Sequence, residues 1–237
     1  MNIFLKIILP IFFILFLYAC YVIYPIYQAM NLSTMDHTPP FEQHPQNPNK
    51  SILVAGDSIA VGIGAIDPKE SIAGRLGQQF PNADIINLGV SGARLKDLLS
   101  VLHKQNKKQY DLIVLQIGGN DITHFTPYNT IRSELAEVIS LSNEMSPKTI
   151  ILTSGNIGSA PMFHWPLSAI LTDRTLKVRA IFIEEIAKNR AVSYIDLFKD
   201  PKDDPLAKNT KKYYAQDRFH LSGDGYGIWY LSIQKLL

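Results

Sequence analysis

The chain carries a serine, an aspartate and a histidine in contexts that suit nucleophilic catalysis. Ser58 stands in a Gly-Asp-Ser triplet, where the glycine permits a tight turn that can present the hydroxyl at a sheet edge. Asp217 and His220, in the tetrapeptide DRFH, are three residues apart and would face the same way on one helical turn. The carboxylate could then hold the Nδ1 proton of the histidine and leave Nε2 free as a base. Each motif alone has an ordinary explanation, because serine commonly caps helices and an isolated D-x-x-H is usually surface charge.

Two glycine-containing motifs between these residues can supply hydrogen-bond donors to a reacting oxygen. The segment 89–92 (GVSG) ends in Gly92, whose backbone N–H can approach a ligand closely. The segment 118–121 (GGND) combines a sharp turn with the side-chain N–H of Asn120. Donors of this kind stabilise the oxyanion of acyl transfer, although either motif by itself reads as a turn.

Short buried strands alternate with longer amphipathic helices along the rest of the chain. Strands are expected at residues 51–55, 83–88, 110–117, 148–154 and 191–195. Helices are expected near residues 69–80, 94–106, 127–145, 167–189 and 222–236. Five strands that are each followed by a helix predict an α/β fold with a parallel sheet and helices on both faces. Such sheets bind ligands at the carboxyl ends of their strands, which is where Ser58, Gly92 and Asn120 fall.

The motifs together contain a nucleophile, oxyanion donors, a base and an orienting carboxylate, which is the full equipment for acyl transfer. No G-x-S-x-G elbow occurs, so the usual α/β-hydrolase arrangement is not indicated. The glycines of the segment 62–64 lack the G-x-G-x-x-G spacing of a dinucleotide loop. The sequence has no Cys/His cluster at zinc spacing, and the expected chemistry needs neither a metal nor an organic cofactor.

In these four motifs the chain resembles the SGNH hydrolases, also called the GDSL lipases and esterases. The likeness covers essentially all of residues 51–237, with GDSIA at the place of the commoner GDSL. It implies a flavodoxin-like, three-layer α/β/α fold with a central parallel sheet of about five strands.

The resemblance also implies roles for individual residues. The implied catalytic residues are Ser58 as nucleophile, His220 as base and Asp217 as the carboxylate that orients the base. The implied oxyanion hole consists of the backbone N–H groups of Ser58 and Gly92 and the side chain of Asn120, supported by Asp57 and Gly119.

A long apolar run stands at the N-terminus. Residues 3–27 hold 22 apolar residues in 25, interrupted by Lys6, Pro10 and Pro25. The uncharged stretch after Lys6 would span about 31 Å as a helix, close to the roughly 30 Å of a bilayer's hydrocarbon core. By the positive-inside rule, the N-terminus stays cytoplasmic and the catalytic domain is exported to the periplasmic or extracellular side.

Two processed forms compete with an uncleaved anchor. A cleaved signal peptide would need a small-residue cleavage site, and no convincing one follows the run. A lipoprotein signal would use the single cysteine, Cys20, but Tyr18 is bulky for that motif and the run continues apolar past Cys20. The length of the run favours the uncleaved membrane helix.

The composition separates the chain into three parts. They are an anchor at 1–27, a Pro-rich polar tether at 28–49 that is expected to be semi-extended, and a hydrolase domain at 50–237. The chain has 237 residues, 46% of them apolar, so it is too apolar to be disordered. Its 23 basic and 21 acidic residues nearly balance, which gives no electrostatic case for a nucleic-acid partner.

The expected activity is hydrolysis of lipid, aryl or small acyl esters. The same residues would also serve an envelope carbohydrate O-acetylesterase or an acyltransferase, and a tethered binding protein with an inactive site is a further alternative. The apolar loop 161–166 (PMFHWP) is expected either to border the substrate pocket or to pack onto the domain or the membrane surface.

Overall fold

A computed structural model describes residues 3–35, 39–105 and 108–237. Its core is one five-stranded sheet with the order β2-β1-β3-β4-β5. The strands are β1 (Lys50–Gly56), β2 (Ala83–Gly89), β3 (Leu112–Gln116), β4 (Thr149–Leu152) and β5 (Val192–Ile195). All neighbouring strands are parallel, which confirms the five predicted strands and their arrangement.

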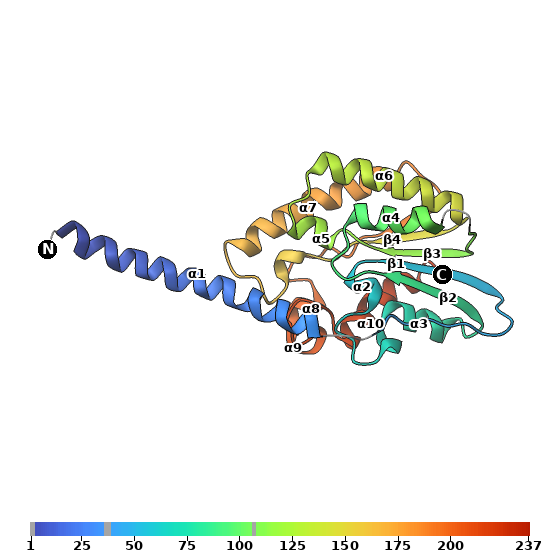
Figure 1. Cartoon of the computed structure of the whole chain (residues 1–237), viewed down its shortest axis with the longest axis horizontal. Helices are drawn as coiled ribbons and strands as arrows, with labels where there is room; N and C mark the ends of the chain where they lie inside the picture. The colour runs from blue at the N-terminus through green and yellow to red at the C-terminus, as the bar shows by residue number, and fades with distance from the viewer. Residues whose placement is uncertain (1–2, 36–38, 106–107) are drawn as a thin grey trace.

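Helices cover both faces of the sheet, giving three layers (Figure 1). One face carries α4 (Leu95–Gln105), α6 (Tyr128–Met145) and α7 (Leu167–Ile186). The other carries α2 (Ser58–Val61), α3 (Ile72–Gln79) and α10 (Gly223–Gln234). Side chains alternate along a strand, so Leu53 packs into the first layer while Ile52 and Val54 pack into the second. The connections contain the short helices η1 (Pro68–Glu70), α5 (Gly119–Thr123), η2 (Ile157–Ser159), α8 (Pro205–Lys208) and α9 (Thr210–Tyr213).

The strand order creates a switch point at β1. The chain runs from β1 outward to β2 and then crosses back to β3 on the opposite side of β1. Loops that follow β1, β2 and β3 therefore diverge at one end of the sheet and leave a crevice there. The segments after these strands carry Ser58 at the start of α2, Gly92 in a turn and Asn120 in α5, so the topology itself brings the three residues to one place.

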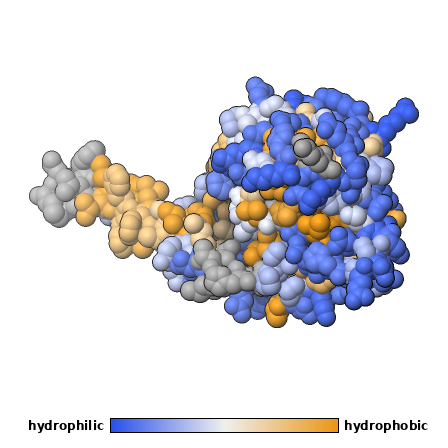
Figure 2. Space-filling model, turned by 45° about the vertical axis from the view of Figure 1, so that its right-hand side comes forward, coloured by the Kyte–Doolittle hydropathy of each residue, from blue (hydrophilic) through white to orange (hydrophobic). Residues whose placement is uncertain are grey.

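The N-terminal run forms α1 (Ile3–Met35), which extends away from the domain as a long rod (Figure 1). Its segment Ile8–Asn31 is long and apolar enough to cross a membrane, and the most apolar 18-residue stretch of that segment contains no buried residue. Figure 2 shows apolar side chains along this projection, beside a domain surface that is largely hydrophilic. Length and composition make α1 a candidate membrane anchor or signal sequence.

The structure corrects the predicted tether. Residues 28–35 continue α1 instead of being semi-extended, because this stretch contains helix-tolerant residues and no proline before Pro39. Residues 36–38 lie outside the described residues. Beyond them the chain lies on the domain, where Gln43 pairs with Ile85 through two backbone hydrogen bonds of 2.8 and 3.1 Å. This pairing covers the exposed edge of β2, and Phe41 packs close to Gly77 of α3.

Candidate active site

Ser58 is placed by a tight turn at the end of β1. Gly56 has φ +141°, and a Cβ there would stand 1.9 Å from the carbonyl oxygen of Gln116, so the turn requires glycine. Asp57 then caps α2, its Oδ1 accepting a 2.9 Å hydrogen bond from the N–H of Ile59. Because Asp57 performs the capping, the hydroxyl of Ser58 is not used for it. The ordinary explanation of Ser58 as a helix cap is therefore wrong.

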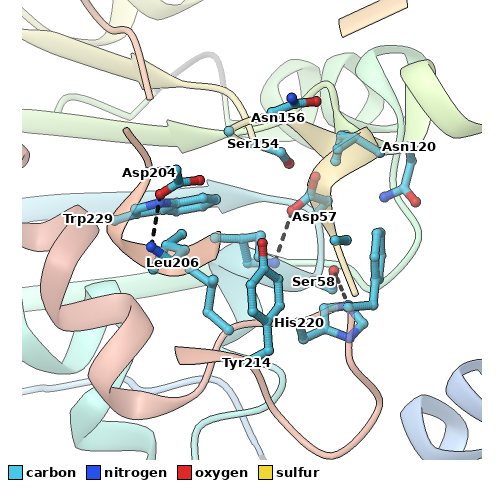
Figure 3. Close-up of a pocket in the computed structure, with 17 residues that line it drawn as sticks. Asp57, Ser58, Asn120, Ser154, Asn156, Asp204, Leu206, Tyr214, His220 and Trp229 are labelled. Carbon is cyan, nitrogen blue, oxygen red and sulfur yellow. Dashed lines mark hydrogen bonds between the residues drawn. The ribbon is translucent and has the colours of Figure 1, made fainter. Parts of the chain in front are cut away.

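The structure brings Ser58, His220 and Asp217 into one hydrogen-bonded chain. Nε2 of His220 lies 2.9 Å from Oγ of Ser58, and its Nδ1 lies 2.5 Å from Oδ2 of Asp217 (Figure 3 shows the first of these contacts). All three side chains are buried. The pair of Asp217 and His220 lies on a turn before α10, not on a helical turn as the sequence suggested. Oδ1 of Asp217 accepts hydrogen bonds from the N–H groups of Phe219 and His220 at 2.9 Å each. Between them, Arg218 adopts the left-handed backbone conformation, with φ +61°.

The electrostatics of this turn keep Asp217 ionised. Burial on its own raises the pKa of the carboxyl, but the hydrogen bond from His220 and the two backbone N–H donors outweigh it and hold the pKa below its usual value. A carboxylate at Nδ1 fixes the tautomer in which Nε2 can accept a proton. The arrangement can thus remove the proton of the Ser58 hydroxyl.

Gly92 and Asn120 are the other two residues that the sequence predicts as donors to a reacting oxygen. Together with Ser58 they line one cavity. Among the described residues, the backbone N–H groups of Ser58 and Gly92 donate to no protein acceptor. Asn120 gives one amide hydrogen to the carbonyl of Ala93 at 3.0 Å, which orients the side chain and leaves its second hydrogen available. The loop that positions Asn120 needs Gly119, whose Cβ would come within 2.5 Å of Oγ of Ser154.

Asp57 is a second buried carboxyl beside the serine. Its side chain is 3% exposed. Burial raises the pKa of Asp57 to about 7, against the lowering effect of the Ile59 N–H. The neighbouring carboxyl of Asp121 is also buried, and burial raises its pKa as well. The Gly-Asp-Ser triplet is visible in the sequence, but the burial of its aspartate is not. The sequence therefore gives no indication that the pKa of Asp57 is raised.

Two cavities of different character meet at Ser58. One, of about 50 Å³, has a partly polar lining that includes Asp57, Asp204, Tyr214 and Trp229 (Figure 3). The other, of about 550 Å³, is lined mainly by apolar side chains. Its lining includes Met162 and Phe163, so the loop 161–166 borders a pocket as the first of its two interpretations proposed.

Arg174 of α7 is a site residue that the sequence analysis missed. It is 7% exposed and donates hydrogen bonds to the carbonyls of Asp121, Ile122 and Thr126. These bonds hold α5, the short helix that contains Asn120, and the turn that follows it. A charged residue in an amphipathic helix is normally expected to be exposed to solvent. The sequence therefore does not distinguish Arg174 from the other charged residues of α7.

The described residues contain no group of three or more His, Cys, Asp or Glu side chains that could hold a metal ion.

Comparisons with known proteins bear on the family and the fold of the chain. A model of the GDSL-like lipase/acylhydrolase family matches residues 54–228. The structure is similar to a lipolytic protein of the G-D-S-L family from Veillonella parvula (17% identity, 79% of this chain and 97% of that chain, TM-score 0.60). It is also similar to the acetylxylan esterase Axe2 from Geobacillus stearothermophilus (18% identity, 80% and 94% coverage, TM-score 0.55). A protein from Lactobacillus plantarum shares 19% identity over 82% of this chain and 98% of that chain, with a TM-score of 0.63.

No curated protein matches the sequence significantly. The structural neighbours share the three-layer fold, and the family match covers most of the catalytic domain, including Ser58, Gly92, Asn120, Asp217 and His220. The chain belongs to the GDSL-like lipase/acylhydrolase family and is an ester hydrolase of the GDSL type.

Proposed function

We propose that the protein hydrolyses carboxylic esters through a covalent acyl-enzyme on Ser58. The observation that carries this proposal is the hydrogen-bonded chain from Asp217 through His220 to Ser58, with distances of 2.5 and 2.9 Å. Its position at the junction of two cavities gives an ester room on both sides of the nucleophile.

In the first half-reaction, Oγ of Ser58 attacks the ester carbonyl carbon while Nε2 of His220 takes the hydroxyl proton. The negative charge that forms on the carbonyl oxygen is stabilised by the N–H groups of Ser58 and Gly92 and the amide of Asn120. The tetrahedral intermediate then expels the alcohol, which receives the proton from His220.

In the second half-reaction, His220 removes a proton from water as the water attacks the acyl group on Ser58. Collapse of this intermediate releases the carboxylic acid and returns the proton to Ser58. One ester and one water thus give one acid and one alcohol, and Asp217 stabilises the imidazolium in both steps.

Deacetylation of a carbohydrate, or transfer of an acyl group to an alcohol, is the second candidate. The cavity of about 50 Å³ beside Ser58 suits an acetyl group, and one structural neighbour is an acetylxylan esterase. The large apolar cavity favours an alkyl ester over a sugar. Product analysis with p-nitrophenyl acetate in the presence of alcohols or glycans separates hydrolysis from acyl transfer, because transfer would yield a new ester instead of free acid.

Labelling of Ser58 tests the proposal directly. We expect a fluorophosphonate probe to label the folded wild-type protein and to abolish its esterase activity, and Ser58→Ala to lack both label and activity. Ser100→Ala is the matched control, since Ser100 is exposed on α4 and bonds to the carbonyl of Lys96. Wild-type esterase activity in Ser58→Ala would overturn the proposal.

We also propose that α1 remains as a membrane anchor with a cytoplasmic N-terminus, and that residues 50–237 form the exported catalytic domain. The support is the candidate span Ile8–Asn31 and the position of Lys6 before it. Protease added outside intact spheroplasts should digest the domain while a tag at the N-terminus stays protected. Protection of the domain from the added protease would show the opposite orientation, with the domain on the cytoplasmic side.

A further inference from the structure

The large cavity at Ser58 has a wall that does not belong to the catalytic domain. Three of its lining residues, Ile26, Ala29 and Met30, come from the last turns of α1. The domain supplies the facing apolar side chains, which include Phe125, Phe163 and Leu167. The cavity therefore lies between the N-terminal helix and the active site.

One face of α1 is seated on the domain. Ala29 is 4% exposed, whereas Ile23 and Tyr27, which are not among the residues that line the cavity, are 60% and 62% exposed. Further along the same contact, the ring of Tyr21 stacks on His164 with 4.4 Å between centroids. The hydroxyl of Tyr18 donates to the carbonyl of Trp165 in the same loop. Residues 18, 21, 26 and 29 recur near helical spacing, so the contact is a stripe along one side of α1.

The chemistry of the two cavities points to what each can hold. The small cavity of about 50 Å³ includes the carboxyls of Asp57 and Asp204 in its lining and has no room for an alkyl chain. The large one, of about 550 Å³, combines apolar walls with Ser58, Gly92 and Asn120 at one end. An ester placed with its carbonyl oxygen at those donors can extend an alkyl chain beneath α1.

We infer that the end of α1 completes the substrate pocket, and that the preferred substrates are esters whose alkyl chain packs against Ile26, Ala29 and Met30. This inference rests on the proposed function and names the substrate class of that site. Each methylene that the ester buries in the cavity corresponds to about a fourfold gain in kcat/KM. The value of kcat/KM should therefore rise with the length of the alkyl chain until the cavity is full. Because α1 is also the proposed anchor, the chain of an ester dissolved in a bilayer lies within reach of the cavity.

The test uses the full-length protein in lipid nanodiscs, so that no free detergent competes for the cavity. One series varies the acyl chain of p-nitrophenyl esters from acetyl to decanoyl. A second series varies the alcohol chain of acetate esters, and the series that responds identifies which side of the ester lies under α1. In wild type, we expect kcat/KM to rise at least tenfold from the shortest to the best chain in one series.

Two substitutions in α1 alter the wall in opposite ways. Ala29→Phe fills the cavity and should lower the ratio of long-chain to short-chain kcat/KM at least tenfold, moving the optimum to shorter chains. Ile26→Ala removes contacts and should lower that ratio several-fold. Ile23→Ala is the matched control, because it makes the same change one turn away at an exposed residue that does not line the cavity, and it should leave the ratio as in wild type.

The results separate this inference from the proposed function. The inference alone is overturned if the wild type hydrolyses acetyl esters through Ser58 but its kcat/KM does not rise with chain length. It is also overturned if Ala29→Phe and Ile26→Ala both keep the wild-type ratio of long-chain to short-chain kcat/KM in both series. If the wild-type protein has no esterase activity that depends on Ser58, both the proposed function and this inference are overturned. Fluorophosphonate labelling of each variant verifies that it is folded, and Ile26→Ala decides the question if Ala29→Phe does not fold.

Discussion

Nε2 of His220 lies 2.9 Å from Oγ of Ser58, although 162 positions separate the two residues in the chain. Ser58 is delivered by the turn after β1, and His220 by the turn before α10. The contact therefore exists only when the first strand and the last helix occupy the same end of the folded domain. The proposed nucleophile and base are positioned by the whole fold.

Asp217→Asn should impair catalysis severely without unfolding the protein. An asparagine is nearly isosteric, but its NH₂ group or its neutral oxygen cannot stabilise an imidazolium at Nδ1 of His220. We expect kcat to fall by about 10⁴, as in other triads that lose this carboxylate while the geometry is kept. Steady-state hydrolysis of p-nitrophenyl esters measures the loss.

The control for this prediction is Asp224→Asn, the same chemical change at an exposed position of α10. It should retain wild-type kcat. Equal activity of Asp217→Asn and wild type would remove Asp217 from the proposed mechanism.

Asn120→Ala should lower kcat by about 10²–10³, the usual effect of losing one side-chain donor to an oxyanion. KM should change little, because the donor acts mainly on charge that develops in the transition state. Asn129→Ala, at an exposed position of α6, is the comparison. A rise in KM at unchanged kcat would instead assign Asn120 to ground-state binding.

The strands and long helices were predictable because their signals are local. Buried strands such as β1 and β3 stand out as short runs of branched apolar residues, and the amphipathic period of α6 marks a helix without any tertiary information. The positions of Ser58, Gly92 and Asn120 followed, since parallel strands place their carboxyl ends along one edge.

The remaining features depend on contacts between distant segments. The tether prediction was wrong at residues 28–35 and incomplete near Gln43, because pairing with the edge of β2 is visible only after β2 has found its place in the sheet. The turn at Asp217 could not be told from a helical turn, since both place residues three apart on one side. Likewise, the burial of Arg174 depends on the loop that α7 packs against.

Arg174→Met should loosen α5 and the turn that follows it. The buried carbonyl of Thr126 would lose the donor that Arg174 supplies, and the carbonyls of Asp121 and Ile122 would each keep only a backbone N–H donor. We expect a loss of about 1–3 kcal/mol in the free energy of unfolding, the usual cost of leaving buried acceptors unsatisfied. Urea unfolding followed by near-UV circular dichroism measures it, and kcat should fall as well because Asn120 loses its support.

Arg179→Met is the control on the same helix. Arg179 pairs with Asp196, and both side chains are about one third exposed, at 33% and 34%. An ion pair of that exposure contributes about 0–1 kcal/mol, so this variant should lose less stability than Arg174→Met. The reverse order would show that the carbonyls in the loop are satisfied without Arg174.

Asp57→Asn should change the pH dependence of stability in a defined direction. In the folded protein burial raises the pKa of Asp57 to about 7, above the roughly 3.9 of an unfolded chain. Between these values the folded state binds more protons than the unfolded state, so wild-type stability falls as pH rises through this window. Asparagine keeps an oxygen that can accept from the N–H of Ile59 but does not ionise.

The free energy of unfolding of wild type should therefore decline relative to that of Asp57→Asn by up to about 4 kcal/mol between pH 4 and 8. Urea unfolding across that range measures the difference, in which the contributions of other titrating groups cancel. A difference that is independent of pH would show that Asp57 is ionised in the folded protein throughout, and that a donor or cation compensates its burial.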